Sequence, residues 1–468
     1  MLIRHTYSPI SRLYAIRVAP SIGRGTGIMG RMNETIKIER MGYGAAAVGH
    51  LANGKAVFVE GAAPDEVCEV RVTTEKPSFA EAELVEIIEK SEKRMENDCP
   101  RFGACGGCQM RHMKYAAQLE CKKEIVENAI RRIGGFADFS LDEVIGAENT
   151  YNYRNKAVFR AGYENGRVIC GFSAAKSHTV VSADDCLICN EAFPEIATAV
   201  AEHANKYNIP PFDGKRGILK SVFTRSSRKT GEIVAVISVN AKKLTREDEL
   251  VKIILSASDK VSGIALETSG NLSVLYGNET LTEEICGIEF TVSPQSFLQV
   301  NSAQTERLYE KALEFAGIKS TDVVMDIYCG IGTISLAAAK RATRVIGVEK
   351  VKRAIEDAKK NAERNKITNA EFFAAGAEEI VPELIKRGER PDIVILDPPR
   401  AGSDEKTLAA ICEAAPDKIV YVSCDAASLA RDLKFICANG YKITRSAACD
   451  MFPHTAHIET VVKLERKI

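Results

Sequence analysis

The chain has 468 residues, enough for two or three domains with well-buried cores. Hydrophobic residues make up 45% and charged residues 27%, as in ordinary globular proteins, and no apolar run is long enough to cross a bilayer. The formal net charge is zero, which excludes a global electrostatic field as the means of holding a nucleic acid. Such a partner would have to be held by local basic patches.

The chain contains 14 cysteines, and no secretory signal precedes them. This combination argues against a disulfide framework and favours a cytoplasmic protein that uses clustered cysteines for metal binding or catalysis. Residues 1–31 contain five arginines and no acidic residue. We expect residues 1–32 to be a disordered extension, with Met32 as the natural start. A basic arm or an organelle presequence is the alternative.

The pattern of residues 33–92 predicts a small β-barrel. Period-two alternation marks residues 35–38, and further strands are expected at residues 56–59, 67–72 and 82–88. Asn53-Gly54 is a strong hairpin turn. Short strands with glycine turns suit an OB-like barrel, a shape that often holds RNA. The pattern leaves equally open a barrel that only packs on its neighbour.

A cysteine-rich motif follows the barrel, with Cys99, Cys105 and Cys108 within ten residues. Three thiolates need a fourth ligand, and Cys186 and Cys189 are the candidates. Zinc accepts the same ligands, but the uneven spacing and the paired glycines favour an iron–sulfur cubane. Unrelated free thiols are a poor explanation of this spacing.

The middle of the chain carries basic residues but few motifs. A helix is expected over residues 118–133, and strands are expected at residues 157–160 and 221–224. Basic side chains concentrate in residues 111–132 and 215–229. They are either phosphate-contacting patches or solvated surfaces, and charge alone does not separate the two.

The last third of the chain, residues 291–468, alternates strands and helices. This alternation predicts an α/β fold, a doubly wound parallel sheet with helices on both faces. Strands are expected at residues 323–328, 345–349, 371–374, 393–396, 418–422, 441–447 and 458–464. Helices are expected at residues 302–315, 334–341, 351–365 and 427–438.

A glycine turn joins the first of these strands to its helix. Asp326, Gly330 and Gly332 belong to this stretch, and Glu349 ends the next strand. Such glycines let the backbone approach a ligand closely, and the acidic residue can accept hydrogen bonds from ribose hydroxyls. NAD would fit the same layout, although the third glycine of its motif is missing. Asp397-Pro398-Pro399-Arg400 ends the fourth strand and favours a base-modifying methyltransferase that uses S-adenosylmethionine, although Asp-Pro-Pro alone would be a rigid turn.

A buried strand ends in a cysteine at Val422-Ser423-Cys424-Asp425. A thiol at the carboxyl end of a strand in an α/β sheet sits where ligands bind. Carbon 5 of uracil is a poor nucleophile, but addition of a thiolate to carbon 6 makes it enolate-like and able to attack a methyl group. A base must then remove the proton from carbon 5 so that the thiol can leave. Glu459, where a loop runs into the last strand, is the candidate base, although alone it would be taken for a surface carboxylate.

Together these motifs resemble the RNA uracil-C5-methyltransferase family over residues 33–468. The matching motifs are Phe297-Leu298-Gln299-Val300-Asn301, Asp326-Ile327-Tyr328-Cys329-Gly330-Ile331-Gly332-Thr333, Asp397-Pro398-Pro399-Arg400, Val422-Ser423-Cys424-Asp425 and His457-Ile458-Glu459. The resemblance implies a TRAM barrel at residues 33–92 and a central iron–sulfur and RNA-binding domain at residues 93–290. It implies a class I, Rossmann-like methyltransferase domain at residues 291–468.

The resemblance also implies roles for single residues. Cys424 would be the nucleophile and Glu459 the base. The residues that would line the S-adenosylmethionine site are Gln299, Tyr328, Gly330, Gly332, Thr333, Glu349 and Asp397. A four-iron, four-sulfur (4Fe-4S) cluster, as in the ribosomal-RNA branch, would be held by Cys99, Cys105, Cys108 and Cys186. Two positions depart from the family: Asp425 replaces the usual Asn, and Gly376-Ala377-Glu378 lacks an acid directly after the glycine.

The implied activity is 5-methyluridine formation in 23S rRNA by a monomeric cytoplasmic enzyme without an obligate protein partner. The target uridine is expected in a loop or bulge, because it must leave its stack to reach Cys424. Methylation of tRNA is disfavoured because the tRNA branch generally lacks both barrel and cluster. A non-catalytic RNA-binding protein is the other alternative, and the intact Cys424 and Glu459 speak against it.

Overall fold

The computed structural model describes residues 33–467, in two compact units. The N-terminal unit comprises residues 33–125, 173–178 and 452–457, and the C-terminal unit comprises residues 126–172, 179–451 and 458–467. The expected extension at residues 1–32, with its possible start at Met32, lies outside the described residues. No helix in the described range is both long and apolar enough to cross a membrane.

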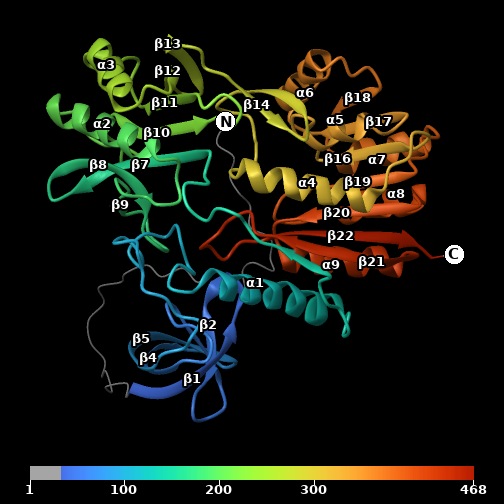
Figure 1. Cartoon of the computed structure of the whole chain (residues 1–468), viewed down its shortest axis with the longest axis horizontal. Coiled ribbons are helices and arrows are strands. Elements are labelled where there is room, and N and C mark those ends of the chain that lie inside the picture. Colours follow the sequence, from blue (N-terminus) through green and yellow to red (C-terminus); the bar gives the residue numbers. More distant parts are fainter. Residues whose placement is uncertain (1–32, 468) are drawn as a thin grey trace. The chain divides into compact units, whose positions relative to one another are not determined.

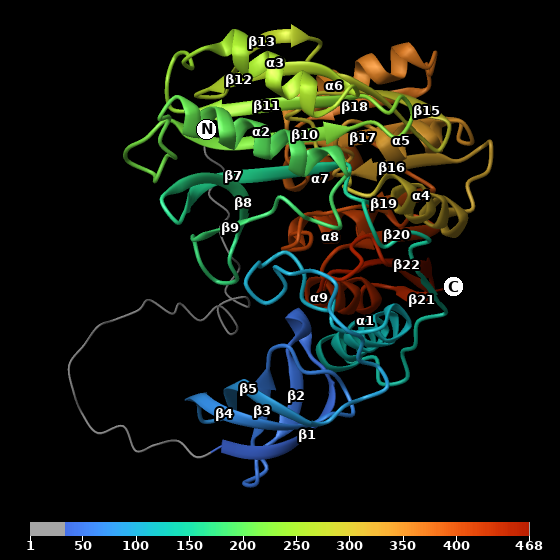
Figure 2. The same cartoon turned by 60° about the vertical axis from the view of Figure 1, so that its left-hand side comes forward.

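The N-terminal unit contains the barrel that the sequence predicts. Its described strands close in the order β1-β2-β3-β5-β4. Their bounds are β1 (Asn33–Met41), β2 (Ala47–His50), β3 (Ala56–Val59), β4 (Val67–Glu75) and β5 (Phe79–Glu89), with a short 3-10 helix η2 (Tyr43–Ala45). Ile36 and Ile38 are buried while Lys37 and Glu39 are exposed, so the period-two pattern fills the barrel interior. Figure 2 shows the closed barrel in blue.

A long helix, α1 (Tyr115–Ala129), follows the cysteine-rich motif. Ala117, Cys121 and Ile125 on α1 pack into the same core as the barrel strands. The helix begins three residues before the predicted residue 118, and its end is a π-helical turn, η3 (Ile130–Gly134), that stops at Gly135 with φ +80°. Glycine suits this left-handed position because it has no Cβ to clash.

The C-terminal unit contains two sheets. Among the described strands, the first sheet has seven in the order β13-β12-β11-β10-β7-β8-β9. Their bounds are β7 (Lys156–Glu164), β8 (Arg167–Ser173), β9 (Val180–Ser182), β10 (Leu219–Ser226), β11 (Ile233–Val239), β12 (Val261–Thr268) and β13 (Asn271–Gly277). Helices α2 (Ala192–Lys206) and α3 (Glu247–Ala257) share one hydrophobic core with the sheet. The predicted strands at residues 157–160 and 221–224 are the inner parts of β7 and β10.

The second sheet is the doubly wound one, and within residues 33–467 it has eight strands in the order β18-β17-β16-β19-β20-β22-β21-β6. Figure 1 shows β16, β19, β20, β22 and β21 lying side by side in this order. The strand bounds are β6 (Glu143–Ile145), β16 (Val323–Ile327), β17 (Arg344–Glu349), β18 (Ala370–Ala374), β19 (Ile393–Leu396), β20 (Lys418–Ser423), β21 (Tyr441–Cys449) and β22 (Glu459–Arg466). The helix bounds are α4 (Ser302–Ala316), α5 (Thr333–Ala339), α6 (Lys352–Arg364), α7 (Ala377–Lys386), α8 (Glu405–Ala414) and α9 (Ala426–Ala438).

The strands from β18 to β20 run parallel, as the alternation of strands and helices predicts. The chain moves outward from β16 through β17 to β18, and then in the opposite direction through β19 to β20. Right-handed crossovers in opposite directions place their helices on opposite faces, so the sheet is covered on both. Strand β22 then enters antiparallel beside β20, and β6, from well before the last third of the chain, pairs with β21 at the edge.

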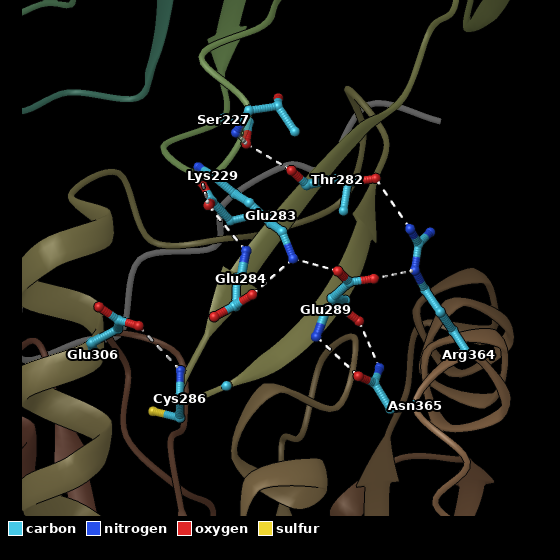
Figure 3. Close-up of polar contacts among 12 residues, drawn as sticks. Ser227, Lys229, Thr282, Glu283, Glu284, Cys286, Glu289, Glu306, Arg364 and Asn365 are labelled. Carbon is cyan, nitrogen blue, oxygen red and sulfur yellow. Dashed lines mark hydrogen bonds and ion pairs between the residues drawn. The ribbon is translucent and has the colours of Figure 1, made fainter.

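A hairpin formed by β14 (Leu281–Ile285) and β15 (Ile288–Val292) joins elements of both sheets. In Figure 3, Lys229 of the β10–β11 turn forms ion pairs with Glu284 and Glu289 of the hairpin. Arg364 of α6 pairs with Glu289 at 3.2 Å, and the Asn365 amide donates to the Glu289 carbonyl at 2.7 Å. The hairpin therefore ties the first sheet to helix α6 of the second.

The buried carboxylate Glu283 in this hairpin gives a stability prediction. It accepts hydrogen bonds from the backbone N–H of Arg228 (3.0 Å) and Lys229 (3.2 Å) and from Ser302 Oγ (3.2 Å). We expect Glu283→Ala to lower the free energy of unfolding by about 2–4 kcal/mol, because it leaves these buried donors without an acceptor. Urea unfolding measures the loss. The exposed ion-pair partner is the control: Glu284→Ala should cost below about 1 kcal/mol, and equal losses would contradict the assignment.

Candidate active site

The carboxyl ends of the parallel strands meet at one edge of the second sheet, and β22 begins at that same edge. Ser423, the last residue of β20, pairs with Thr460 of β22. Cys424 follows Ser423 and Glu459 precedes Thr460, so the antiparallel register brings the predicted nucleophile and the predicted base to the same level of the sheet. Cys449 of β21 pairs with Glu459 from the other side.

The turn between β16 and α5 exposes its backbone. Tyr328, Gly330 and Gly332 have φ of +69°, +56° and +86°. A Cβ on Gly332 would meet the Ala358 Cβ at 3.3 Å, whereas a Cβ on Gly330 would meet nothing within 4 Å. The turn thus leaves open space at Gly330 and leads directly into Thr333, the first residue of α5. This is the geometry by which a glycine turn admits a ligand close to the backbone.

Acidic side chains lie on the two strands on either side of this turn, Asp326 on β16 before it and Glu349 on β17 after it. Asp326 is 1% exposed; its Oδ2 accepts a hydrogen bond from Ser335 Oγ at 2.5 Å, and its Oδ1 has no partner among the described residues. Burial raises the pKa of Asp326 to about 6. Glu349, at the end of β17, accepts the backbone N–H of Val351 at 2.8 Å. The open turn and the unpartnered Asp326 oxygen fit a ligand such as S-adenosylmethionine, which carries hydroxyl and ammonium donors.

Asp397 and Gln299 are two further residues predicted to line the site. Burial, with a smaller contribution from the charge of Asp326, raises the pKa of the Asp397 carboxyl to about 7. Gln299 is buried in the loop before α4, and its backbone carbonyl accepts a hydrogen bond from Asn155 Nδ2 at 3.1 Å. The buried guanidinium of Arg225 donates to two further carbonyls of this loop, at 2.7 and 3.0 Å. Residues of the first sheet thus fix the loop that presents Gln299.

Cys424 lies between the end of β20 and the start of α9, and it is partly buried. Burial raises the pKa of its thiol to about 12, and the charges of Glu459 and Asp397 act in the same direction. Arg400 acts in the opposite direction. The thiol therefore stays protonated in the free protein at neutral pH. Since charges act strongly only over short distances, these effects indicate that Glu459, Asp397 and Arg400 lie in the neighbourhood of the thiol.

Asp425, the first departure from the family pattern, has a clear structural role. Its carboxylate caps α9 by accepting the backbone N–H groups of Ala427 (3.1 Å) and Ser428 (2.8 Å). An Asn side chain accepts the same hydrogen bonds through its carbonyl oxygen, and both residues are good helix N-caps. The departure therefore preserves the helix start that places Cys424.

The second departure lies at the start of α7. The Glu378 carboxylate folds back over Gly376, so that a Cβ there would meet Glu378 Oε1 at 2.7 Å. Burial raises the pKa of Tyr328, and the charge of Glu378 makes a small contribution in the same direction. The Tyr328 hydroxyl hydrogen-bonds Ser403 Oγ at 2.9 Å. The acidic group near Tyr328 is therefore Glu378, which stands one position further along the chain than the acid that follows the glycine in the family.

Glu459 is 1% exposed, and its Oε2 has no hydrogen-bond partner in the part of the chain that the structure describes. Burial and, to a smaller extent, the charge of Asp397 raise its pKa to about 8, and the charge of Arg400 opposes the shift. A carboxylate with a pKa raised in this way is, once ionised, a stronger base than an exposed one. The site therefore combines a protonated thiol with a basic carboxylate.

The raised pKa of Glu459 predicts that stability falls as pH rises. The folded protein binds this proton with a pKa of about 8, against an ordinary value of 4.5, so the stabilising contribution is complete below about pH 4.5 and lost by about pH 8. We expect Glu459→Gln to raise the melting temperature at about pH 8.5 and to change it little at about pH 5. The corresponding gain in the free energy of unfolding at the higher pH is on the order of a few kcal/mol. Thermal unfolding at both pH values tests this, and a difference that is independent of pH would contradict it.

Sequence reasoning missed Tyr309, a fully enclosed side chain on α4. Its pKa is raised by burial and by the charges of Asp397, Glu459 and Asp326, and Thr333 hydrogen-bonds it. In the sequence, Tyr309 is one more apolar-face position of a helix, so no motif marks it. A buried network beneath the site was missed as well: Asp432 accepts from the Tyr421 hydroxyl at 2.5 Å and from the backbone N–H of Ser403 at 2.8 Å.

The predicted cluster ligands are divided between the units: Cys99, Cys105 and Cys108 lie in the N-terminal unit and Cys186 in the C-terminal unit. Within residues 33–467, no three Cys, His, Asp or Glu side chains converge closely enough to hold a metal ion. Cys105 Sγ accepts the backbone N–H of Gly107 at 3.4 Å, and a hydrogen bond from Cys189 lowers the pKa of Cys186 to about 6. The cluster stays a prediction.

The sequence was then compared with those of known proteins. Residues 240–467 match the family described as tRNA (Uracil-5-)-methyltransferase, and residues 33–85 match the TRAM domain. An uncharacterized RNA methyltransferase of Clostridium tetani is 39% identical over 436 residues, which are 91% of this chain and 94% of the relative. An uncharacterized RNA methyltransferase of Clostridium acetobutylicum is 37% identical over 444 residues, 92% of this chain and 96% of the relative.

The fold was compared with solved structures. The crystal structure of Pyrococcus abyssi tRNA (uracil-54, C5)-methyltransferase in complex with S-adenosyl-L-homocysteine is similar, with a TM-score of 0.73 and 24% sequence identity. The likeness covers 92% of this chain and 100% of that one, and it confirms the predicted methyltransferase fold. The predicted barrel is confirmed as a TRAM domain. The chain therefore belongs to the RNA uracil-C5-methyltransferase family, with a TRAM domain preceding the S-adenosylmethionine-dependent methyltransferase fold.

Proposed function

We propose that the protein methylates carbon 5 of a specific uridine in 23S rRNA through a covalent adduct with Cys424. The observation that carries the proposal is the register of β20 and β22, which sets Cys424 and Glu459 at one level of the sheet edge. A nucleophile and a base placed together serve both halves of this reaction. No obligate partner protein is needed, because both residues come from one chain.

The residues of the site act in a defined order. The Cys424 thiol gives up its proton to solvent, and Sγ forms a bond to carbon 6 of the uracil. The electron pair of the carbon 5–carbon 6 double bond moves to carbon 5, which attacks the methyl group. S-adenosylmethionine supplies that methyl group, and the positive charge of its sulfur, when it is bound. Glu459 then takes the proton from carbon 5, the carbon 5–carbon 6 double bond reforms, and the Cys424 thiolate leaves. We propose Gln299, Tyr328, Gly330, Gly332, Thr333, Glu349 and Asp397 as the cofactor-binding residues.

An exposed aromatic ring supports an RNA substrate. Phe297 is 67% exposed, two residues before Gln299, and the Lys156 ammonium lies 5.9 Å from the centre of its ring. A ring that stacks on a base beside a cation that meets phosphate is the combination by which proteins hold single-stranded RNA. The target uridine is accordingly expected in a loop or bulge.

The choice of 23S rRNA rests on the cysteine motif, which resembles the ribosomal-RNA branch; the TRAM barrel does not separate the two, because the likeness to the Pyrococcus abyssi tRNA enzyme covers 92% of this chain. A tRNA substrate is the second candidate, because the similar Pyrococcus abyssi structure is named as a tRNA (uracil-54, C5)-methyltransferase. Both candidates use the same chemistry and differ only in the RNA.

Nucleotide-resolution mapping of 5-methyluridine in cells with and without the gene decides between them. The proposal expects loss of the modified base at one or two 23S rRNA positions. Loss confined to tRNA would keep the chemistry and reassign the substrate. No loss in either RNA would overturn the proposed activity.

We propose in addition that Cys99, Cys105, Cys108 and Cys186 hold a 4Fe-4S cluster. The close spacing of the first three cysteines supports this, as does the N–H donated by Gly107 to Cys105 Sγ, because sulfurs of such clusters commonly accept backbone hydrogen bonds. Cys189→Ser provides the matched control, since Cys189 is the other candidate in the same short stretch.

Anaerobically purified protein should be brown and carry about four irons per chain, following from the composition of the cluster. Cys105→Ser should abolish the colour and the iron, whereas Cys189→Ser should keep both. A colourless protein that contains only zinc would contradict the assignment.

A further inference from the structure

The segment that leads into Glu459 belongs to the N-terminal unit. Residues 452–457 cluster with residues 33–125 by their contacts, although they connect β21 to β22 along the chain. Only Ile458 separates the end of this segment from Glu459. The contacts that hold residues 452–457 therefore influence the position of Glu459.

Gln118 on α1 is the centre of these contacts, and it has 0% exposure. Its Oε1 accepts the backbone N–H of His454 at 2.9 Å, and its Nε2 lies 3.1 Å from His454 Nδ1. The same Nε2 donates to the Met113 carbonyl at 2.9 Å, which fixes the orientation of the amide. One buried side chain thus holds both the backbone and the ring of His454.

Further groups from the same stretch hold the rest of the segment. The His454 carbonyl accepts the backbone N–H groups of Gln109 (3.0 Å) and Met110 (2.9 Å), and Gln109 Oε1 accepts the N–H of Ala456 at 3.2 Å. Lys122 Nζ donates to the Phe452 carbonyl at 3.0 Å. We call Gln109, Gln118 and Lys122 the clasp.

The backbone of the segment needs such support. His454 has φ +68°, in the left-handed region that is unfavourable for a residue with a side chain. A conformation of this kind persists where the surroundings over-determine it. The clasp supplies that constraint at the residue five positions before Glu459.

We propose that Gln118, assisted by Gln109, is a positioning residue for Glu459, because it fixes the segment from which the base emerges. The inference rests on the proposed function. The base acts only in the second half of the reaction, after carbon 5 has gained its methyl group. A misplaced Glu459 therefore slows release of the thiol and leaves the first half, the addition of Cys424, intact.

The test compares two variants of the full chain on rRNA from cells that lack the gene. Gln118→Met keeps the volume and removes the hydrogen bonds to His454. Glu66→Gln is the control, because Glu66 is equally buried in the N-terminal unit and its carboxylate hydrogen-bonds Arg94 rather than the segment that leads into Glu459. The measured quantities are protein–RNA adduct that survives denaturing gel electrophoresis and 5-methyluridine in released RNA.

We expect Gln118→Met to raise the ratio of adduct to released product about tenfold or more, and Glu66→Gln to leave that ratio unchanged. If Gln118→Met does not fold, Gln109→Ala, which removes the acceptor for Ala456, should give the same change in ratio. Wild-type protein that forms neither adduct nor product would overturn the proposed function, and this inference with it. Active wild-type protein with an unchanged ratio in both clasp variants would overturn this inference alone.

Discussion

Replacing Cys424 by alanine is expected to abolish methylation, with a loss of rate of about 10⁴-fold or more. Without the thiol, carbon 5 of the uracil is never activated, and the methyl group has nothing to react with. Neither 5-methyluridine nor a protein–RNA adduct should form. Transfer of radioactive methyl groups to RNA from a gene-deleted strain measures the first, and denaturing gel electrophoresis measures the second.

Cys437→Ala is the matched control, because Cys437 is a partly buried thiol on α9, the helix that begins just after Cys424. It should retain activity within about twofold, as expected for a small change away from the site. Normal methylation by Cys424→Ala would exclude the covalent mechanism and leave a binding role or a direct methyl transfer.

Replacing Glu459 by glutamine should stop the reaction halfway, with turnover reduced by about 10²–10⁴-fold. Glutamine keeps the shape of the side chain but cannot take the proton from carbon 5. Each enzyme molecule should therefore transfer one methyl group and stay attached to the RNA. A radioactive methyl group that migrates with the protein on a denaturing gel would show this state.

Two controls define that result. Glu465→Gln changes a partly exposed carboxylate on the same strand, paired with Lys463, and should release product normally. The double variant Cys424→Ala with Glu459→Gln should form no adduct, because the bond to carbon 6 requires the thiol. Adduct formation in the double variant would place the covalent attachment on another residue.

The strands and turns of the second sheet were predictable because their signals are local. β19 spans the predicted residues 393–396, and the predicted turn at Gly330 and Gly332 has the positive φ that glycine permits. An apolar run bounded by turn residues carries most of the information for a buried strand. The same local signals were enough for the barrel.

The parts that were not predictable depend on pairing between distant residues. β6 joins β21 across about 300 residues of chain, and its three residues carry no strand pattern of their own. Tyr309 enters the site only because α4 packs against the sheet, and Gln118 reaches His454 over 336 positions. Local periodicity gives no information about contacts between residues so far apart in the sequence.

The separation of the two proposed catalytic residues has a genetic consequence. Cys424 follows a parallel strand, while Glu459 opens the hairpin partner β22, so a mutation can displace one and spare the other. If Cys424 and Glu459 act as proposed, loss of the thiol is expected to produce an inactive enzyme, which a second gene copy can compensate. Loss of the carboxylate, or of the segment before it, is expected to produce a protein that stays covalently attached to its RNA. Alleles of the second kind are expected to be dominant and toxic, because each trapped molecule also removes an RNA from use.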